Sequence, residues 1–324
     1  MKIAVVGCGA LGSYYGAMLC RAGCRVHFLL RSDFDVVRKS GVWIESDAGN
    51  FHVQPECARA PEEIGPADLV LIGLKTTANH LLPRLLPPLI GPESAVLTLQ
   101  NGLGNEAAVA AVVGAEKTLG GLCFVCLNRV APGRIRHIAH GAIVMGEYAG
   151  APQPRTHRIC ETIAAAGVHC KVAAHLEQAH WEKLVWNIPF NGLGVAGAAG
   201  YDAVVRGRME PGAKLQFCLT TDLLLGDPRW EQLARELMME TIAAARAKGL
   251  GVPESAAEHQ ISRTRQMGSY KASTLIDFER GQPLELESLF LEPCREARQI
   301  GVPCPRLEAL CAVLMQLSLR ERPE

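Results

Sequence analysis

Residues 3–16 read IAVVGCGALGSYYG, an apolar run followed at once by three glycines. The run predicts a buried strand, and the residues after Gly12 predict a helix. In this context the GxGxxG spacing is typical of a turn that binds the pyrophosphate of a dinucleotide. Gly7 permits the sharp turn, Gly9 lets backbone N–H groups approach the phosphates, and Gly12 allows close helix–strand packing. A purely structural turn is the alternative. The expected cofactor-binding residues are Gly7, Cys8, Gly9, Ala10, Leu11 and Gly12.

The residue that follows the second predicted strand indicates which dinucleotide binds. A site for NAD usually presents an acidic residue about 20 positions after the glycines, but here the stretch FLLRSD places Arg31 there. A guanidinium suits the 2′-phosphate of NADP, because it offers a planar fork of donors and a permanent charge. The alternatives are an exposed loop arginine, or ribose binding by Asp33. Asp33 is better interpreted as the N-cap of a helix beginning at Phe34.

Strands alternate with helices in the first half of the chain, which predicts a parallel sheet with right-handed crossovers. From about residue 173 helical periodicity dominates. We therefore expect an α/β Rossmann-like parallel-sheet domain over 1–172 and an all-α domain over 173–324, with ligands beyond the strand carboxyl ends, facing a cleft between the domains. The predicted strands cover 2–7, 25–30, 67–75 and 94–102, with a further hairpin over 118–148. Helices are predicted over 11–23, 173–191, 229–249, 271–281, 284–301 and 306–322.

Composition excludes several classes of protein. The chain has 33 basic and 33 acidic residues, so a general affinity for nucleic acid or anionic membranes has no electrostatic basis. No apolar run reaches the roughly 20 residues of a membrane helix, and Met1-Lys2 is a poor signal-peptide start. The twelve cysteines are scattered, and the pair Cys123 and Cys126 lies in a predicted strand. We expect a reduced, cytoplasmic protein with no metal site.

Polar residues follow two of the predicted strands where cofactor is expected. Lys75 ends the strand over 67–75, and Gln100 and Asn101 end the next one. Since the carboxyl ends of parallel strands meet at one edge of a sheet, these side chains are candidate cofactor ligands.

Three polar residues form a stripe on an otherwise apolar predicted helix. Lys183, Asn187 and Asn191 are spaced i, i+4, i+8 and therefore share a face. Burying such a stripe costs free energy unless each group is paired or serves a ligand, and desolvation would ease proton loss from the lysine. A polar helix–helix contact or a lysine that reaches to solvent is the alternative. Pro189 should kink this helix by removing its bond to Val185.

Two further polar residues lie near the C-terminus. Ser273 opens one predicted helix, and Glu285 is expected in the first turn of another, where negative charge is favoured. Glu287 is a candidate for the same role.

Taken in order, these motifs resemble the ketopantoate reductase (2-dehydropantoate 2-reductase) family over essentially the whole chain. The motifs are GCGALG, LLR, GLK, LQNG, the region from LGG to GAIVMGE, WEKLVWNIPFN and STLIDFERGQPLE. The resemblance implies NADPH-dependent reduction of the 2-keto group of ketopantoate to (R)-pantoate, on the route to pantothenate and coenzyme A. It also implies an all-α domain like the C-terminal bundle of 6-phosphogluconate dehydrogenase.

The resemblance further implies a role for each matched residue. Lys183 would be the general acid that protonates the forming alkoxide, and Glu285 would lie beside the nicotinamide and the reacting carbon. Polar groups of the substrate would be held by Asn187, Asn191, Ser273 and Asn101, and the cofactor by Arg31, Lys75, Gln100 and Asn101.

Alternatives follow from departures and from other classes. Pro189 and the segment 200–228 differ from the family pattern, so another 2-keto acid is an alternative substrate. A 3-hydroxyacid or 6-phosphogluconate-type dehydrogenase would carry an acidic residue after the second strand, which is absent here. A non-catalytic NADP-binding sensor has no need of the polar stripe. The expected partner is a small 2-keto acid, and a homodimer is compatible with the sequence.

Overall fold

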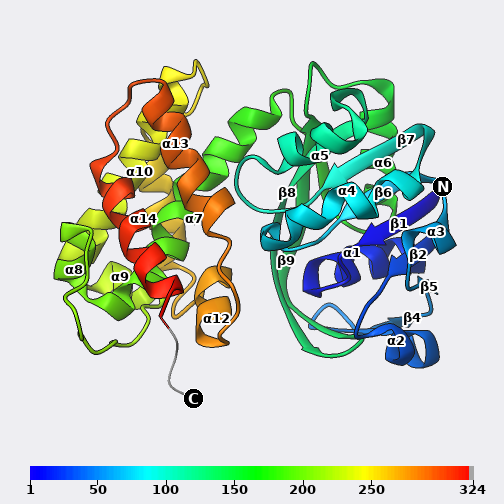
Figure 1. The fold of residues 1–324 in the computed structure, drawn as a ribbon, viewed down its shortest axis with the longest axis horizontal. Helices are drawn as coiled ribbons and strands as arrows, with labels where there is room; N and C mark the ends of the chain where they lie inside the picture. Colours follow the sequence, from blue (N-terminus) through cyan, green and yellow to red (C-terminus); the bar gives the residue numbers. More distant parts are fainter. Residues whose placement is uncertain (321–324) are drawn as a thin grey trace. The chain divides into compact units, whose positions relative to one another are not determined.

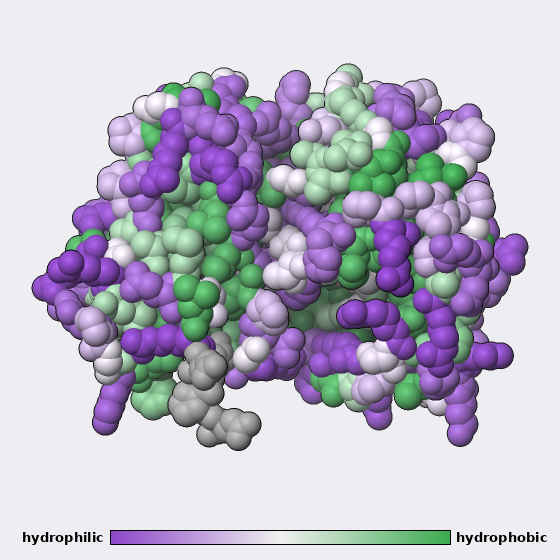
Figure 2. Space-filling view, in the orientation of Figure 1, coloured by the Kyte–Doolittle hydropathy of each residue, from purple (hydrophilic) through white to green (hydrophobic). Residues whose placement is uncertain are grey.

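The computed structural model describes residues 1–320, and the chain divides into two compact units, Met1–Leu176 and Glu177–Glu324. Unit 1 is built on a sheet, and unit 2 consists of helices and connecting segments (Figure 1). Within the described residues, no helix has the length and apolar character needed to cross a membrane. Hydrophilic residues and patches of apolar residues are both present on the visible face of each unit (Figure 2).

Unit 1 contains one ten-stranded sheet in the order β4-β3-β9-β8-β7-β6-β1-β2-β5, with β10 paired to β9. The central strands β2, β1, β6, β7 and β8 run parallel, as the alternating sequence pattern predicts. The strands are β1 (Lys2–Val6), β2 (Arg25–Leu29), β3 (Val42–Ser46), β4 (Phe51–Val53), β5 (Glu56–Ala58), β6 (Ala67–Ile72), β7 (Ile90–Thr98), β8 (Thr118–Ala131), β9 (Arg134–Glu147) and β10 (Cys170–Val172).

Helices cover both faces of this sheet because successive strand residues point to opposite sides. Ile3 and Val5 of β1 pack in one apolar cluster, whereas Ala4 and Val6 pack in the other. The first cluster includes residues of α1 and α6, and the second includes residues of α4, η2 and α5. The helices are α1 (Ala10–Arg21), α2 (Phe34–Ser40), α3 (Pro61–Ile64), α4 (Leu82–Leu85), α5 (Asn105–Val113) and α6 (Pro154–Ala165), with 3₁₀ turns η1 (Thr76–Leu81), η2 (Pro87–Leu89) and η3 (Ala115–Lys117).

Two antiparallel pairs depart from the parallel pattern. The predicted hairpin is confirmed as β8 and β9, which pair antiparallel around Pro132-Gly133. The sheet continues beside this hairpin. β3 pairs parallel with the first residues of β9, and β4 pairs antiparallel with β3. The fold expected for unit 1 is therefore confirmed, with a mostly parallel sheet.

Unit 2 is helical, with α7 in contact with several of the other helices. Gly192 of α7 faces the side chains of Leu310 and Phe290 so closely that an added Cβ would lie 2.6 and 2.9 Å from them. The indole Nε1 of Trp186 donates to Thr264 on another helix at 2.9 Å. The elements are α7 (Leu176–Ala196), η4 (Gly197–Ala199), α8 (Tyr201–Arg206), α9 (Thr221–Gly226), α10 (Pro228–Ala247), α11 (Ala256–Arg265), α12 (Ser273–Glu279), the π-helical turn η5 (Glu287–Leu291), α13 (Glu292–Gln299) and α14 (Pro305–Ser318).

Three local predictions need correction or comment. Helix α7 continues without interruption through Pro189, although proline offers no N–H to bond with Val185. The helix predicted over 284–301 begins only at Leu286. The helix predicted over 306–322 ends at Ser318, and its last two predicted residues lie outside the described range. No disulfide joins any of the twelve cysteines, all of which are described.

Candidate active site

The turn between β1 and α1 has the geometry that the glycine spacing predicts. Gly7 has a φ of 94°, and an added Cβ would lie 2.3 Å from the backbone nitrogen of Leu74. At Gly12 an added Cβ would lie 2.2 Å from the carbonyl oxygen of Gly7. Both positions therefore exclude any side chain for reasons internal to the fold.

Gly9 behaves differently from its two neighbours in the motif. Apart from Gly9 itself and its immediate chain neighbours, no atom of the described residues lies within 4 Å of a Cβ added at this position. Gly9 is also the N-cap of α1. Because glycine has no side chain, no side-chain hydrogen bond caps this helix. Its carbonyl accepts the first helical bond from Ser13 at 3.1 Å. The space beside Gly9 at the start of α1 is thus open, and a helix N-terminus is a place where an anion can bind.

The ends of four parallel strands bring the predicted cofactor residues to one edge of the sheet. Val6 is in register with Ile72 on one side and with Leu29 on the other, and Ile72 is in register with Thr98. The segments that follow these strands carry the glycine turn, Arg31, Lys75, Gln100 and Asn101. Unit 1 therefore gathers this part of the predicted site.

The prediction that Lys75 ends its strand is wrong by a few residues. Strand β6 ends at Ile72, and Lys75 is the exposed N-cap residue of η1. Beyond the strand the chain passes close to the start of α1: an added Cβ on Gly73 would lie 2.9 Å from the backbone of Gly12. Lys75 stays at the predicted edge, on a turn and not on the strand.

A chain of amide side chains fixes the segment after β7. The hydroxyl of Thr98 donates to Gln100 Oε1 at 2.9 Å, and Gln100 Nε2 donates to Asn79 Oδ1 at 2.7 Å. Asn79 in turn donates to Asn105 at 3.1 Å, and Asn105 Nδ2 donates to the carbonyl of Asn101 at 2.9 Å. Gln100 and Asn105 are buried. The network holds the backbone of Asn101 in place, and it engages the side chain of Gln100 within the protein.

Arg31 and Asp33, the two rivals for the ribose of the cofactor, differ in their surroundings. Arg31 is exposed just after β2. Asp33 lies at the N-cap position of α2, but its side chain does not cap the helix, which corrects the prediction. Its carboxylate instead pairs with Arg129 of β8, with contacts of 2.5 to 3.0 Å.

The pKa of Asp33 reflects this ion pair. Burial raises the pKa of the carboxyl, but hydrogen bonds from Arg129 and Ser32 and the guanidinium charge outweigh burial, so the pKa is lowered overall. The carboxylate of Asp33 is therefore committed to Arg129, which leaves Arg31 as the exposed charged group of this loop.

In unit 2 the structure brings together three of the predicted substrate residues. Asn187 and Asn191 are buried on α7, one turn apart, and Asn191 Nδ2 lies 3.4 Å from Asn187 Oδ1. Asn191 Oδ1 accepts from the Ser273 hydroxyl at 3.3 Å and from the backbone N–H of Thr274 at 3.1 Å. Asn191 thus caps the start of α12 and positions Ser273. Lys183 lies on the same face of α7 and is half-buried.

The two candidate glutamates are clearly different. Glu285 is 6% exposed, whereas the side chain of Glu287 is 63% exposed and pairs with Arg295 at 2.7 Å. The prediction that Glu285 lies in the first turn of a helix is wrong by one residue, because the helix begins at Leu286. The carbonyl of Glu285 accepts the N–H of Leu289 at 3.3 Å. The π-helical turn η5 begins two residues after Glu285, and this rare conformation is frequent at functional sites.

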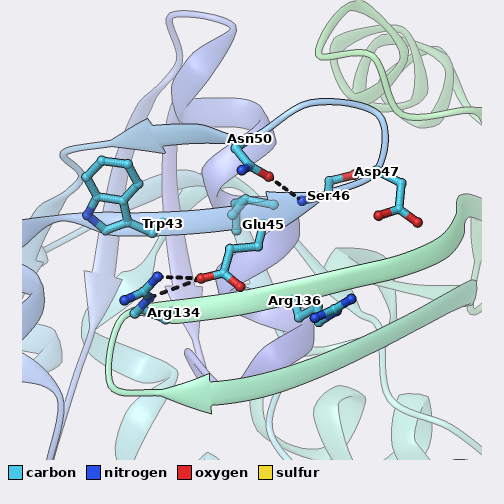
Figure 3. Close-up of a pocket in the computed structure, with 8 residues that line it drawn as sticks. Trp43, Glu45, Ser46, Asp47, Asn50, Arg134 and Arg136 are labelled. Carbon is cyan, nitrogen blue, oxygen red and sulfur yellow. Dashed lines mark hydrogen bonds and ion pairs between the residues drawn. The ribbon is translucent and has the colours of Figure 1, made fainter.

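A polar hollow in unit 1 lies beside β3 and the start of β9 (Figure 3). Glu45 and Arg134 in its wall form an ion pair, and Asn50 accepts a hydrogen bond from the backbone N–H of Ser46. None of the residues that line it belongs to the predicted site. We therefore do not assign the hollow to the active site.

Comparisons with known proteins agree with this geometry. Residues 3–150 match the family described as "Ketopantoate reductase PanE/ApbA", and residues 215–318 match its C-terminal counterpart. The chain is 37% identical over 327 residues to a curated 2-dehydropantoate 2-reductase of Nostoc sp., covering 99% of this chain and 96% of the relative. The chain belongs to the ketopantoate reductase family. It is an oxidoreductase of this family, whose members depend on nicotinamide dinucleotides.

Solved structures extend the comparison with the ketopantoate reductase family. The 2-dehydropantoate 2-reductase of Geobacter metallireducens is 41% identical, with a TM-score of 0.88, and the match covers 98% of this chain and 99% of that one. A D-mandelate dehydrogenase solved with NADH and anilino(oxo)acetate has a TM-score of 0.84 at 17% identity, with 98% of each chain covered. This second likeness shows a shared fold alone.

The ketopantoate reductase motifs do not include all the residues that build the site. Asn79 and Asn105 support Gln100 and Asn101, and Arg129 engages Asp33. Asn105 stands just after the LQNG motif, so its position near the strand end could have suggested a role. Asn79 and Arg129 come from distant segments, and their sequence surroundings carried no such signal.

Proposed function

We propose that the chain catalyses NADPH-dependent reduction of ketopantoate to (R)-pantoate in the cytoplasm, on the route to pantothenate and coenzyme A. The observation that carries the proposal is the glycine turn at the carboxyl edge of the sheet, open at Gly9, in a chain that belongs to this family. The buried Asn187 and Asn191, with the exposed Ser273 bonded to Asn191, support a site for a small polar substrate.

The proposed cofactor site uses groups of unit 1. N–H groups at the start of α1 would hold the pyrophosphate, because the dipole and the uncapped donors favour an anion there. Arg31 would bind the 2′-phosphate, and this role is supported by its exposure and by the engagement of Asp33 with Arg129. Lys75 and Asn101 lie at the same edge and would contact the cofactor.

The proposed chemistry requires a proton at the carbonyl oxygen of the substrate. When bound, the reduced nicotinamide supplies the hydride. Lys183 would donate a proton to the oxygen as negative charge develops on it. Asn187, Asn191 and Ser273 would orient the substrate through its polar groups, and the contact of Asn191 with the start of α12 holds this set rigid. We assign the buried Glu285, in preference to the exposed Glu287, to the position beside the reacting carbon.

The test is NADPH oxidation measured with ketopantoate and with a panel of branched and unbranched 2-keto acids. We expect ketopantoate to have the highest kcat/KM and the product to be (R)-pantoate by chiral chromatography. A higher kcat/KM for another acid would replace ketopantoate as substrate. Tight NADPH binding without oxidation on any acid would identify a sensor.

The preference for NADPH is tested separately with the Arg31→Ala variant. Loss of the guanidinium should raise KM for NADPH and leave KM for NADH nearly unchanged, because only NADPH carries the 2′-phosphate. An Arg38→Ala variant, which removes an exposed arginine of α2, serves as the matched control. Equal behaviour of the Arg31 and Arg38 variants would contradict the assignment of Arg31.

A further inference from the structure

Three cysteines and a glutamate converge at the junction of α13 and α14. Cys294 lies on α13, Cys304 is the N-cap residue of α14, and Cys311 lies further along α14. The sulfur atoms of Cys294 and Cys304 are 3.8 Å apart, and the Cys304 sulfur is 4.0 Å from Glu308 Oε1. All three cysteines are buried, at 5%, 2% and 4% exposed. This thiol cluster plays no part in the proposed reaction.

The distances fit a tetrahedral metal site. Two thiolates bound to Zn²⁺ at about 2.3 Å in tetrahedral geometry lie about 3.8 Å apart. One ligand atom from each of Cys294, Cys304 and Glu308 lies within 4.8 Å of the others. Cys304, Glu308 and Cys311 are spaced i, i+4, i+7, so they share one face of α14. The donor atoms are thus already arranged on helices, before any metal is added.

An arginine lies beside the carboxylate of the thiol cluster. The guanidinium Nε of Arg298 donates to Glu308 Oε1 at 2.6 Å. Carboxylates that ligate a metal are commonly held by a hydrogen bond of this kind.

We propose that Cys294, Cys304 and Glu308 bind a zinc ion. Each thiol that ligates the ion releases one proton, and the oxidation state of the metal does not change. The three ligands come from α13 and the start of α14, so a bound ion would tie these two helices together. The proposal departs from the expectation of no metal, because these ligands come together only through the fold.

A disulfide between Cys294 and Cys304 is a less satisfactory interpretation of the same residues. Redox-sensing cysteines are usually accessible to oxidants, whereas these two are almost fully buried. A disulfide also gives no role to Glu308 and its arginine.

The test is binding of Zn²⁺, and of Co²⁺ as a spectroscopic probe, to the reduced chelator-treated protein. We expect one Zn²⁺ per chain, release of protons, a rise in melting temperature, and the thiolate charge-transfer and intense d–d absorption of tetrahedral Co²⁺. Cys294→Ser and Cys304→Ser should abolish the spectrum, and Cys24→Ser in unit 1 is the matched control. Glu308 is partly exposed, so Glu308→Gln should keep the fold. This variant should weaken Zn²⁺ binding by at least about tenfold, since loss of a residue that only orients a metal ligand already lowers metal affinity by about 10–100-fold.

Several outcomes would overturn the zinc site. One is failure of the reduced, folded protein to bind Zn²⁺ or Co²⁺. Another is binding that Glu308→Gln and the folded cysteine variants retain at parental affinity. Formation of a Cys294–Cys304 disulfide in air, without metal binding under reducing conditions, would establish the redox interpretation instead. None of these readouts depends on the reductase activity, so failure of the proposed function would leave the result intact.

Discussion

Alanine substitution at Gly9 and at Gly12 should separate cofactor binding from folding. Gly9 has a φ of −74° and a ψ of −154°, which alanine adopts, and the described chain leaves the space beside it open. At Gly12 the new Cβ would lie 2.2 Å from the Gly7 carbonyl oxygen, where ordinary contact begins near 3.4 Å. The two glycines belong to one motif, but only Gly12 is required by the packing of the protein itself.

The expected magnitudes follow from these distances. Gly12→Ala must open the turn by about 1.2 Å, and overpacking of this kind costs about 1–3 kcal/mol, or a fall in Tm of roughly 2–4 °C per kcal/mol. For Gly9→Ala, the poorer cap of about 0.5–1 kcal/mol is offset by a similar gain from the less flexible unfolded chain. Its Tm should stay within about 2 °C. Loss of one charge-assisted hydrogen bond to phosphate costs about 1.5–3 kcal/mol, or about 10- to 150-fold in Kd.

The assay pairs thermal melting with calorimetric titration of NADPH for the parent and both variants. Gly9→Ala should melt with the parent and bind NADPH at least about tenfold more weakly. Gly12→Ala should melt at a lower temperature. Parental NADPH affinity in Gly9→Ala would refute the argument that the backbone at this position approaches the phosphates.

Three further predictions concern single groups. Asp33→Asn should lower Tm by about 2–4 °C at pH 7, since a partly exposed ion pair stabilises by about 1 kcal/mol. The difference in Tm between parent and variant should shrink as pH falls below about 4. A carboxyl whose pKa is lowered in the folded state contributes stability only while it is ionised. Melting curves measured across pH check this. Ser273→Ala should lower kcat/KM with Tm unchanged. Asn191→Ala should lower both kcat/KM and Tm, because it leaves the buried backbone N–H of Thr274 without its acceptor. A parental Tm for Asn191→Ala would count against the bond between Thr274 and Asn191. Glu285→Gln should reduce kcat in steady-state assays while Glu287→Gln retains it, and the reverse order would exchange their roles.

The sequence predicted unit 1 well because its signals are local. Strand, turn and helix follow one another within residues 2–21, and the glycine spacing carries the geometry of the turn. The partner of Asp33 could not be predicted, since Arg129 reaches it from a distant strand. A helix cap and an ion pair are equally compatible with an aspartate at this position, and only tertiary structure distinguishes them.

In unit 2 the spacing of the polar stripe placed Lys183, Asn187 and Asn191 on one face of α7, as found. The contact of Asn191 with the start of α12 depends on helix packing, which periodicity does not encode. The same limit applies to the thiol cluster. Its cysteines have no metal-binding spacing in the sequence and converge only because α13 and α14 meet at their ends.

The central claim is that Lys183 donates the proton to the substrate oxygen, and kcat of Lys183→Met at saturating NADPH and ketopantoate tests it most directly. Loss of a general acid should lower kcat by about 10²–10⁴-fold, while the Kd for NADPH changes less than about twofold. A variant that turns over at the parental rate would contradict the claim.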